Sequence, residues 1–185
     1  ELAFWNTKFP GIKALSSVKQ REEIRHKSEE RPDLVIELDA AKKIASETRK
    51  FLTGRIYPGM GTGDTELYKA FCWRFWMLCR RSGDIGIILP RSVFVTSGSS
   101  AWRCEVLPSS STEISFTKNT KEWLFNDVNP GWPIALVSIS PSRETQSLSI
   151  RGTFESKEEY ELGMQSSGAT VDIGMLQRVD ELLCI

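Results

Sequence analysis

Few side chains of this chain have the type and spacing that chemistry requires. The single histidine, His26, lies between two basic residues in a charged stretch, whereas a general base needs an ordered and partly buried setting. We therefore predict that His26 is an ordinary surface residue. The cysteines show no C-x-x-C spacing and no neighbouring histidines, so we predict reduced thiols, no metal site and a reducing, cytoplasmic location. They are Cys72, Cys79, Cys104 and Cys184.

Other familiar catalytic patterns are incomplete. The glycines of 59–63 are spaced G-x-G-x-G, with no buried strand before them and no Gly-Lys-Ser/Thr after them. A plain connecting loop is therefore predicted there, not a phosphate-binding loop. No Gly-x-Ser-x-Gly turn is present, and the acidic pairs lie in charge runs that are typical of solvated surfaces. On spacing alone, the chain shows no complete catalytic apparatus.

Two segments stand out because of where they lie relative to predicted strands. Arg91 and Ser92 follow a strand expected over 84–90, and an aromatic-rich loop over 121–132 precedes a strand expected over 133–139. Open α/β sheets bind ligands at the ends of their strands. The loop aromatics therefore have two interpretations, which the residues alone leave open: they fill the core, or they stack against an unpaired base.

The hydrophobic pattern predicts the elements that position these segments. A charged helical hairpin with one narrow apolar stripe is expected over 16–53, on the outside of a domain. A strong amphipathic helix over 64–81, capped by Asp64, leads through a glycine turn into the run 84–90, which is typical of a strand buried on both faces of a parallel sheet. Further elements are a helix over 99–107, strands over 112–116, 133–139 and 146–154, and a helix over 173–183. This alternation predicts an α/β fold.

Composition excludes several classes of protein. The chain has 185 residues, 40% hydrophobic and 26% charged, which excludes a collagenous or fully disordered chain. The longest uncharged run, Val128–Ser142, contains three prolines and is too short to span a bilayer, so no membrane-spanning segment is predicted. The net charge is zero, but residues 1–107 hold 18 basic and 13 acidic groups while 108–185 hold 6 and 11. A basic face on the first part is one interpretation, and a mixed solvated surface is the other.

The sequence resembles a known family in two places. Residues 63–92 read GDTELYKAFCWRFWMLCRRSGDIGIILPRS, a helix with the pattern D-x-x-x-Y-x-x-F-x-x-R that leads through a glycine turn to a strand ending in Leu-Pro. This segment resembles the N6-adenine DNA methyltransferases, above all the large restriction–modification and phage-defence polypeptides that fuse methylase and nuclease. Residues 125–137 resemble the part of these enzymes that closes over the flipped adenine and runs into a central strand. The beginning of the chain, with Phe4-Trp5-Asn6 and the hairpin, resembles an insertion of the same enzymes.

The resemblance implies a fold, an activity and a set of site residues. The fold would be the C-terminal half of a Rossmann-like methyltransferase sheet with an attached charged helical hairpin. The full-length protein would transfer a methyl group from S-adenosylmethionine to adenine N6 in duplex DNA. The flipped base would meet Trp132, Phe125, Asn129 and Pro130, and Arg91 and Ser92 would contact the DNA backbone.

The chain also departs from the family pattern. It has neither the glycine-rich loop that binds S-adenosylmethionine nor the Asn/Asp-Pro-Pro-aromatic motif, since Asn129-Pro130 continues into Gly131. We therefore expect a fragment that begins just after the catalytic motif. On its own it should hold no catalytic residue, no cofactor and no activity, and its partners should be the missing N-terminal half of the methyltransferase or a second copy of itself.

The expected parts of the chain are a lead-in (1–15), the hairpin insertion (16–54), a partial methyltransferase α/β core (55–155) and a C-terminal helical extension (156–185). The alternative to the methyltransferase hypothesis is a non-catalytic α/β binding or scaffold module, whose strand-end aromatics simply belong to the core.

Overall fold

The computed structural model describes residues 1–60, 63–141 and 147–179. The chain forms two compact units, Glu1–Phe51 and Leu52–Ile185. Each unit is described by itself below.

The N-terminal unit is built from helices. They are α1 (Leu2–Lys8), the short 3-10 helix η1 (Pro10–Ala14), α2 (Ser17–Glu30) and α3 (Pro32–Thr53). The hairpin predicted over 16–53 is confirmed. Its turn follows from proline: Arg31 leaves the helical region at φ −129°, as a residue before proline tends to do, and Pro32 begins the next helix.

The lead-in, which the sequence separated from the hairpin, supplies the centre of this unit. Trp5 is fully buried and packs with Ile12, Leu34 and Leu38. The Trp5 ring also stacks on Phe9, with ring centroids 6.2 Å apart. The residues before position 16 and the hairpin therefore form one small hydrophobic core.

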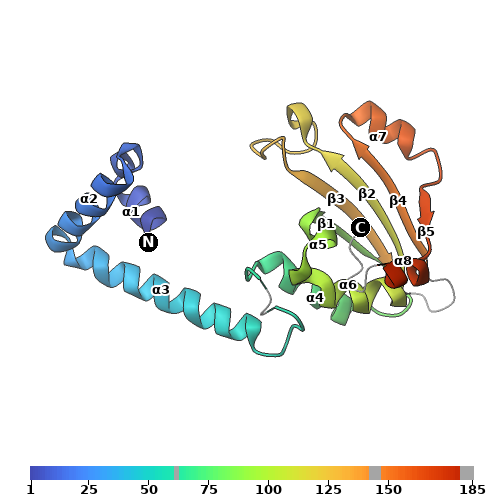
Figure 1. Ribbon diagram of the computed structural model, residues 1–185, viewed down its shortest axis with the longest axis horizontal. Helices are drawn as coiled ribbons and strands as arrows, with labels where there is room; N and C mark the ends of the chain where they lie inside the picture. Colours follow the sequence, from blue (N-terminus) through green and yellow to red (C-terminus); the bar gives the residue numbers. More distant parts are fainter. Residues whose placement is uncertain (61–62, 142–146, 180–185) are drawn as a thin grey trace. The chain divides into compact units, whose positions relative to one another are not determined.

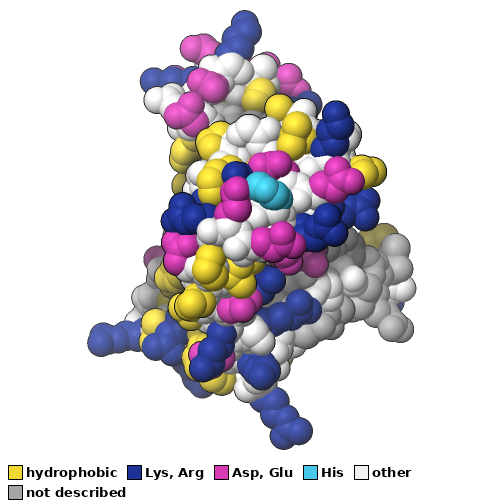
Figure 2. Space-filling view, turned by 90° about the vertical axis from the view of Figure 1, so that its left-hand side faces the viewer, with side chains coloured by type: hydrophobic (Ala, Val, Ile, Leu, Met, Phe, Trp, Pro, Cys, Tyr) yellow, Lys and Arg dark blue, Asp and Glu magenta, His cyan; other side chains and the backbone are white. Residues whose placement is uncertain are grey.

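The surface of the N-terminal unit is strongly and evenly charged. Helix α2 buries none of its residues, and basic, acidic and hydrophobic side chains are interspersed over the face shown in Figure 2. The side chain of His26 is 60% exposed and lies 3.5 Å from Glu30, so the prediction of a surface histidine is confirmed. This mixed surface agrees with the interpretation of solvated charges.

The C-terminal unit combines a mixed sheet with short helices (Figure 1). Its helices are α4 (Leu67–Leu78), α5 (Ser92–Val95), α6 (Ser100–Val106), α7 (Lys157–Gly163) and α8 (Ile173–Val179), with 3-10 turns η2 (Ser97–Ser99), η3 (Leu107–Ser109) and η4 (Thr120–Glu122). Its strands are β1 (Ile85–Pro90), β2 (Ser111–Lys118), β3 (Pro133–Ser140), β4 (Ser147–Phe154) and β5 (Ala169–Val171). The α/β class is confirmed.

The strand order is β1-β3-β2-β4-β5. Strand β3 is antiparallel to both β1 and β2, so β1 and β2 run parallel to one another, joined by α5 and α6. Strand β4 is parallel to β2, and β5 is antiparallel to β4. The prediction that strand 84–90 pairs within a parallel sheet is wrong, because the strand next to β1 is the antiparallel strand β3, which lies between β1 and β2.

Burial on both faces, predicted for the same strand, is also wrong. Ile85 and Leu89 are buried, whereas Ile88 between them is 56% exposed. The backbone N–H of Arg91 donates to the carbonyl of Pro133 (3.1 Å), so by alternation the nitrogen of Pro90 faces away from β3. A proline is tolerated there because that side of β1 pairs with no described strand.

Helices α4, α5 and α6 gather on one side of the sheet and bury the main core there (Figure 1). Phe94 of α5 is fully buried and meets Phe116 of β2 edge to face, with ring centroids 5.9 Å apart. Cys72 of α4 lies in this core, and burial raises the pKa of its thiol to about 12. Cys72 is a buried free cysteine.

Several element boundaries differ from the expected ones. Helix α4 begins after Glu66 and not at Asp64, whose carbonyl instead accepts a hydrogen bond from the Lys69 ammonium (2.7 Å). The extension over 156–185 is helical only in part, because β5 lies within it and pairs with β4. Cys184 and the end of the helix predicted over 173–183 lie outside the described residues.

Candidate functional site

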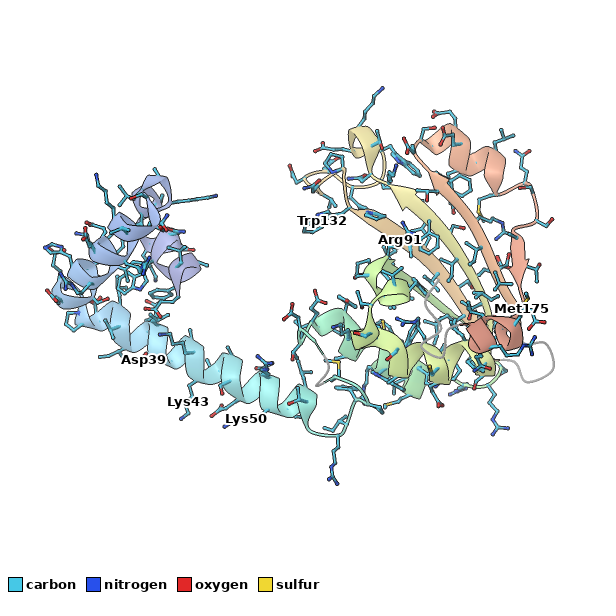
Figure 3. The ribbon with its side chains drawn as sticks, viewed as in Figure 1. Asp39, Lys43, Lys50, Arg91, Trp132 and Met175 are labelled. Carbon is cyan, nitrogen blue, oxygen red and sulfur yellow. The ribbon has the colours of Figure 1, made fainter. Side chains whose placement is uncertain are left out.

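The two segments singled out in the sequence meet at one end of the sheet. The antiparallel register of β1 and β3 pairs Pro90 with Ile134, and the Arg91 N–H bonds to the Pro133 carbonyl. The residue that follows β1 and the residue that precedes β3 are therefore neighbours. Figure 3 shows Arg91 and Trp132 at this end, with Met175 at the other end of the unit.

Trp132 is 69% exposed although it is the largest type of apolar side chain. Its backbone is held by a tight turn: the Trp132 N–H donates to the Asn129 carbonyl (3.2 Å), and the Gly131 N–H donates to Asn129 Oδ1 (2.8 Å). Pro130 is exposed within this turn. The core-filling interpretation is therefore wrong for Trp132, whose ring is presented to solvent by Asn129 and its neighbours.

Phe125 lies deeper than Trp132. Its side chain is half-buried, and both its N–H and its carbonyl are bonded to the side chain of Asn119, at 3.0 and 2.7 Å. Of the two aromatic candidates, Trp132 thus has the more accessible ring.

Arg91 and Ser92 differ in how far their side chains are accessible to an external ligand. Arg91 is exposed, and its guanidinium carbon lies 5.5 Å from the ring centroid of Phe116. Ser92 is half-buried, with its hydroxyl 3.3 Å from the hydroxyl of Tyr68 on α4. Burial is the main cause that raises the pKa of the Tyr68 phenol above its ordinary value. Arg91 can contact an external anion, while Ser92 is already engaged inside the unit.

Sequence reasoning missed Asn119, which the structure places at the base of the loop. Its side chain is fully buried, and it bonds to the backbone of three loop residues, Leu124, Phe125 and Val128. A usable signal was present: asparagine directly after a strand favours side-chain bonds to loop backbone.

The described part of the glycine loop, Gly59 and Met60, and the small cavity beside it have no room for the cofactor that the resemblance implies. A Cβ on Gly59, at φ +76°, would lie 2.8 Å from the Cβ of Ala101, so this part of the glycine loop packs against α6 and leaves no open cradle. The enclosed cavity beside it, between Met60 and Trp102, measures about 10 Å³, roughly the room that one water molecule needs. S-Adenosylmethionine is far larger than this cavity.

The described part of the chain contains neither a cluster of metal-ligating side chains nor a helix that could span a membrane. Over residues 1–60, 63–141 and 147–179, no group of three or more histidine, cysteine or acidic side chains is placed to hold a metal ion. Among the helices of the same segments, none is both long and apolar enough to cross a membrane.

The site at this end of the sheet thus consists of exposed Arg91, directly after β1, and the exposed indole of Trp132, directly before β3 on a loop that the buried amide of Asn119 holds. Comparison with models of known protein families gave no match, and comparison with curated protein sequences gave none either.

Proposed function

We propose that this chain is part of an adenine-specific DNA methyltransferase of a restriction–modification or phage-defence system, located in the cytoplasm. Its contribution would be the surface against which the extruded adenine stacks. The observation that carries the proposal is the 69% exposed ring of Trp132 next to Arg91 at the strand ends. This observation joins the two segments in which the sequence resembles the methyltransferases.

The fold supports the proposal in a general way. Strands β1 and β2 are parallel and are connected through α5 and α6, as in the strand–helix–strand unit of Rossmann-like sheets, although the antiparallel strand β3 lies between them here. Arg91 and Trp132 lie at the carboxyl end of β1, the end at which such sheets bind ligands.

The chemistry assigned to this surface is binding and orientation. An enzyme that modifies a base must extrude it from the duplex, and an aromatic ring compensates for part of the lost stacking. One such contact is worth about 1–3 kcal/mol. Arg91 would contact a phosphate nearby. S-Adenosylmethionine, bound by a part of the protein beyond this chain, would supply the methyl group.

The proposed partner within the enzyme is the N-terminal half of the methyltransferase. Apolar side chains remain exposed on α4 and β1, among them Phe71 (53%), Phe75 (42%), Leu78 (63%) and Ile88 (56%). Exposed apolar patches mark interaction surfaces. We expect residues 1–185 alone to self-associate through such surface, and a strictly monomeric chain in light scattering at high concentration would contradict this expectation.

The test uses the full-length enzyme with Trp132→Ala, and Leu162→Ala as a control that is equally exposed (70%) on α7. We expect Trp132→Ala to lower methylation efficiency about tenfold to a hundredfold. The fluorescence of a 2-aminopurine placed at the target position should change in parallel, because the extruded base loses its stacking partner. Equal activity of wild type and Trp132→Ala would overturn the proposal.

The isolated chain provides a second test, since S-adenosylmethionine should show no measurable binding to it in calorimetry. One low-micromolar site per chain would contradict the fragment interpretation.

The second candidate is a non-catalytic binding or scaffold module. The exposed apolar side chains of α4 favour it equally, because a protein partner would cover them as well. The residues encoded just before Glu1 distinguish the two functions: Asn-Pro-Pro-aromatic is expected for a methyltransferase, and its absence is expected for a scaffold.

A further inference from the structure

We infer that Asn119 is the positioning residue of the 119–132 loop, and that its buried side-chain amide sets the conformation in which Trp132 is presented. The inference deepens the proposed function and rests on it for the role of Trp132. It concerns a residue that contacts neither DNA nor cofactor.

Asn119 uses its whole hydrogen-bonding capacity on this loop. Its Oδ1 accepts the N–H groups of Leu124 and Phe125, each at 3.0 Å. Its Nδ2 donates to the carbonyls of Phe125 (2.7 Å) and Val128 (3.0 Å). A carboxamide offers two donors and two acceptor sites, so all four are satisfied by loop backbone. With its side chain fully buried, Asn119 ties the two ends of the 124–128 segment together.

The bonds continue from this segment to Trp132. Asn129 follows Val128 directly, and it holds Gly131 through its side chain and Trp132 through its carbonyl. The register of β2 and β3 pairs Lys118 with Pro133, so Asn119 and Trp132 are the first residues beyond the last pair, on opposite strands. The position of Trp132 is therefore determined from both sides, by the strand pair and by the loop that Asn119 holds.

The loop needs such a support because its backbone is unfavourable in three places. Lys121, Glu122 and Asp127 all have positive φ angles, between 57° and 60°, although none is glycine. Such conformations persist only where the surrounding structure holds them. Asp127 lies between Phe125 and Val128, the two residues whose carbonyls Asn119 binds. Without Asn119, the loop would lose the contacts that keep this segment in place.

The decisive variant is Asn119→Asp in the full-length enzyme. Aspartate has the same shape and keeps both acceptor contacts, but it cannot donate to the Phe125 and Val128 carbonyls. We expect a fall in kcat of about tenfold to a hundredfold, because a small misplacement of a positioned group has an effect of this size. The KM for DNA should change less, since the phosphate contacts remain.

A double-substitution cycle separates positioning from a general structural role. If Asn119 acts through Trp132, then Asn119→Asp combined with Trp132→Ala should be no slower than Trp132→Ala alone. Residues that act independently show additive effects, so full additivity in kcat would overturn the inference. Leu162→Ala combined with Asn119→Asp is the matched control, and its effects should be additive.

Amide hydrogen exchange tests the loop without reference to methylation. In Asn119→Asp, the amides of Leu124, Phe125 and Trp132 should exchange faster while those of β2 and β3 keep their protection. Unchanged exchange at these amides would overturn the inference whatever the activity shows. If Trp132→Ala leaves methylation unchanged while Asn119→Asp speeds amide exchange in the loop, the proposed function would be overturned. The inference that Asn119 holds the loop would then still stand.

If Asn119→Asp unfolds at the assay temperature, kcat and amide exchange are measured for the wild type and the variant at a lower temperature at which both are folded. We expect the same direction of change there, and an unchanged kcat together with unchanged exchange at Trp132 would overturn the inference.

Discussion

The two units of this chain have hydrophobic cores that are built differently. The N-terminal unit buries one cluster around a single tryptophan, Trp5, and leaves the rest of its helices exposed and charged. The C-terminal unit buries one face of a sheet under three helices, with aromatic contacts between α5, α6 and β2. Both units nevertheless expose an aromatic side chain, Phe51 (59%) in the N-terminal unit and Trp132 (69%) in the C-terminal unit. The units therefore differ in the size and composition of their cores, and only in the C-terminal unit does the exposed ring lie at the end of a strand.

Trp5→Ala should have the largest effect on stability. Truncation of a fully buried tryptophan costs about 3–5 kcal/mol, and the other buried side chains of the unit are few. We expect the N-terminal helices to lose their protection in hydrogen exchange while the amides of the sheet keep theirs. Equal loss of protection in both units would show that they depend on one core, which would break the comparison.

Arg103→Met should destabilise the C-terminal unit by a smaller amount. Arg103 is fully buried, and its guanidinium donates to the carbonyls of Val93 (2.5 Å) and Thr96 (2.8 Å), which ties α6 to the end of α5. Each hydrogen bond to a charged group contributes about 1.5–3 kcal/mol, and replacing Arg103 also removes the desolvation penalty of a buried charge, so we expect a net loss equal to about one such bond in urea unfolding. Arg178→Met, at an exposed position of α8, is the control and should leave the unfolding midpoint unchanged.

Trp132→Ala should leave stability nearly unchanged. Substitutions at exposed positions usually stay within about 0.5 kcal/mol, and the ring of Trp132 is 69% exposed. A melting temperature close to that of the wild type sharpens the contrast with Trp5→Ala, which removes the same ring from a buried position. A fall comparable to that of Trp5→Ala would show that Trp132 belongs to a core after all.

The mildest test alters no residue and compares two thiols of the C-terminal unit. Burial raises the pKa of Cys72 to about 12, so at pH 8 almost none of it is thiolate, whereas Cys104 is exposed. Iodoacetamide should label Cys104 and leave Cys72 unmodified until the unit unfolds, as read by mass spectrometry. Because the pKa is raised, reactivity of Cys72 in the folded state should stay low up to pH values well above 8. Rapid labelling of Cys72 at pH 8 would contradict the rigid core.

Patterns among residues close in the chain were enough to predict much of the secondary structure. Helical spacing, a proline and short apolar runs predicted the hairpin, the helix α6 and the strand β3, because these signals act between residues close in the chain. Helix α7 lies within the extension predicted as helical over 156–185, although its own charged sequence carries little apolar periodicity. The contact of Trp5 with Leu34 and Leu38 was not predicted, because it joins residues far apart in sequence.

The sequence by itself determined the fold class, the hairpin, the surface position of His26 and the two segments that carry the candidate site. The tertiary structure decided that Arg91 and Trp132 are neighbours, that Trp132 is exposed and that Asn119 holds the loop between β2 and β3. It also decided the antiparallel direction of β3, which an apolar run cannot reveal, because a strand buried on one face reads the same in either direction. Strand pairing and burial depend on contacts between distant residues, and such contacts exist only once the chain has folded.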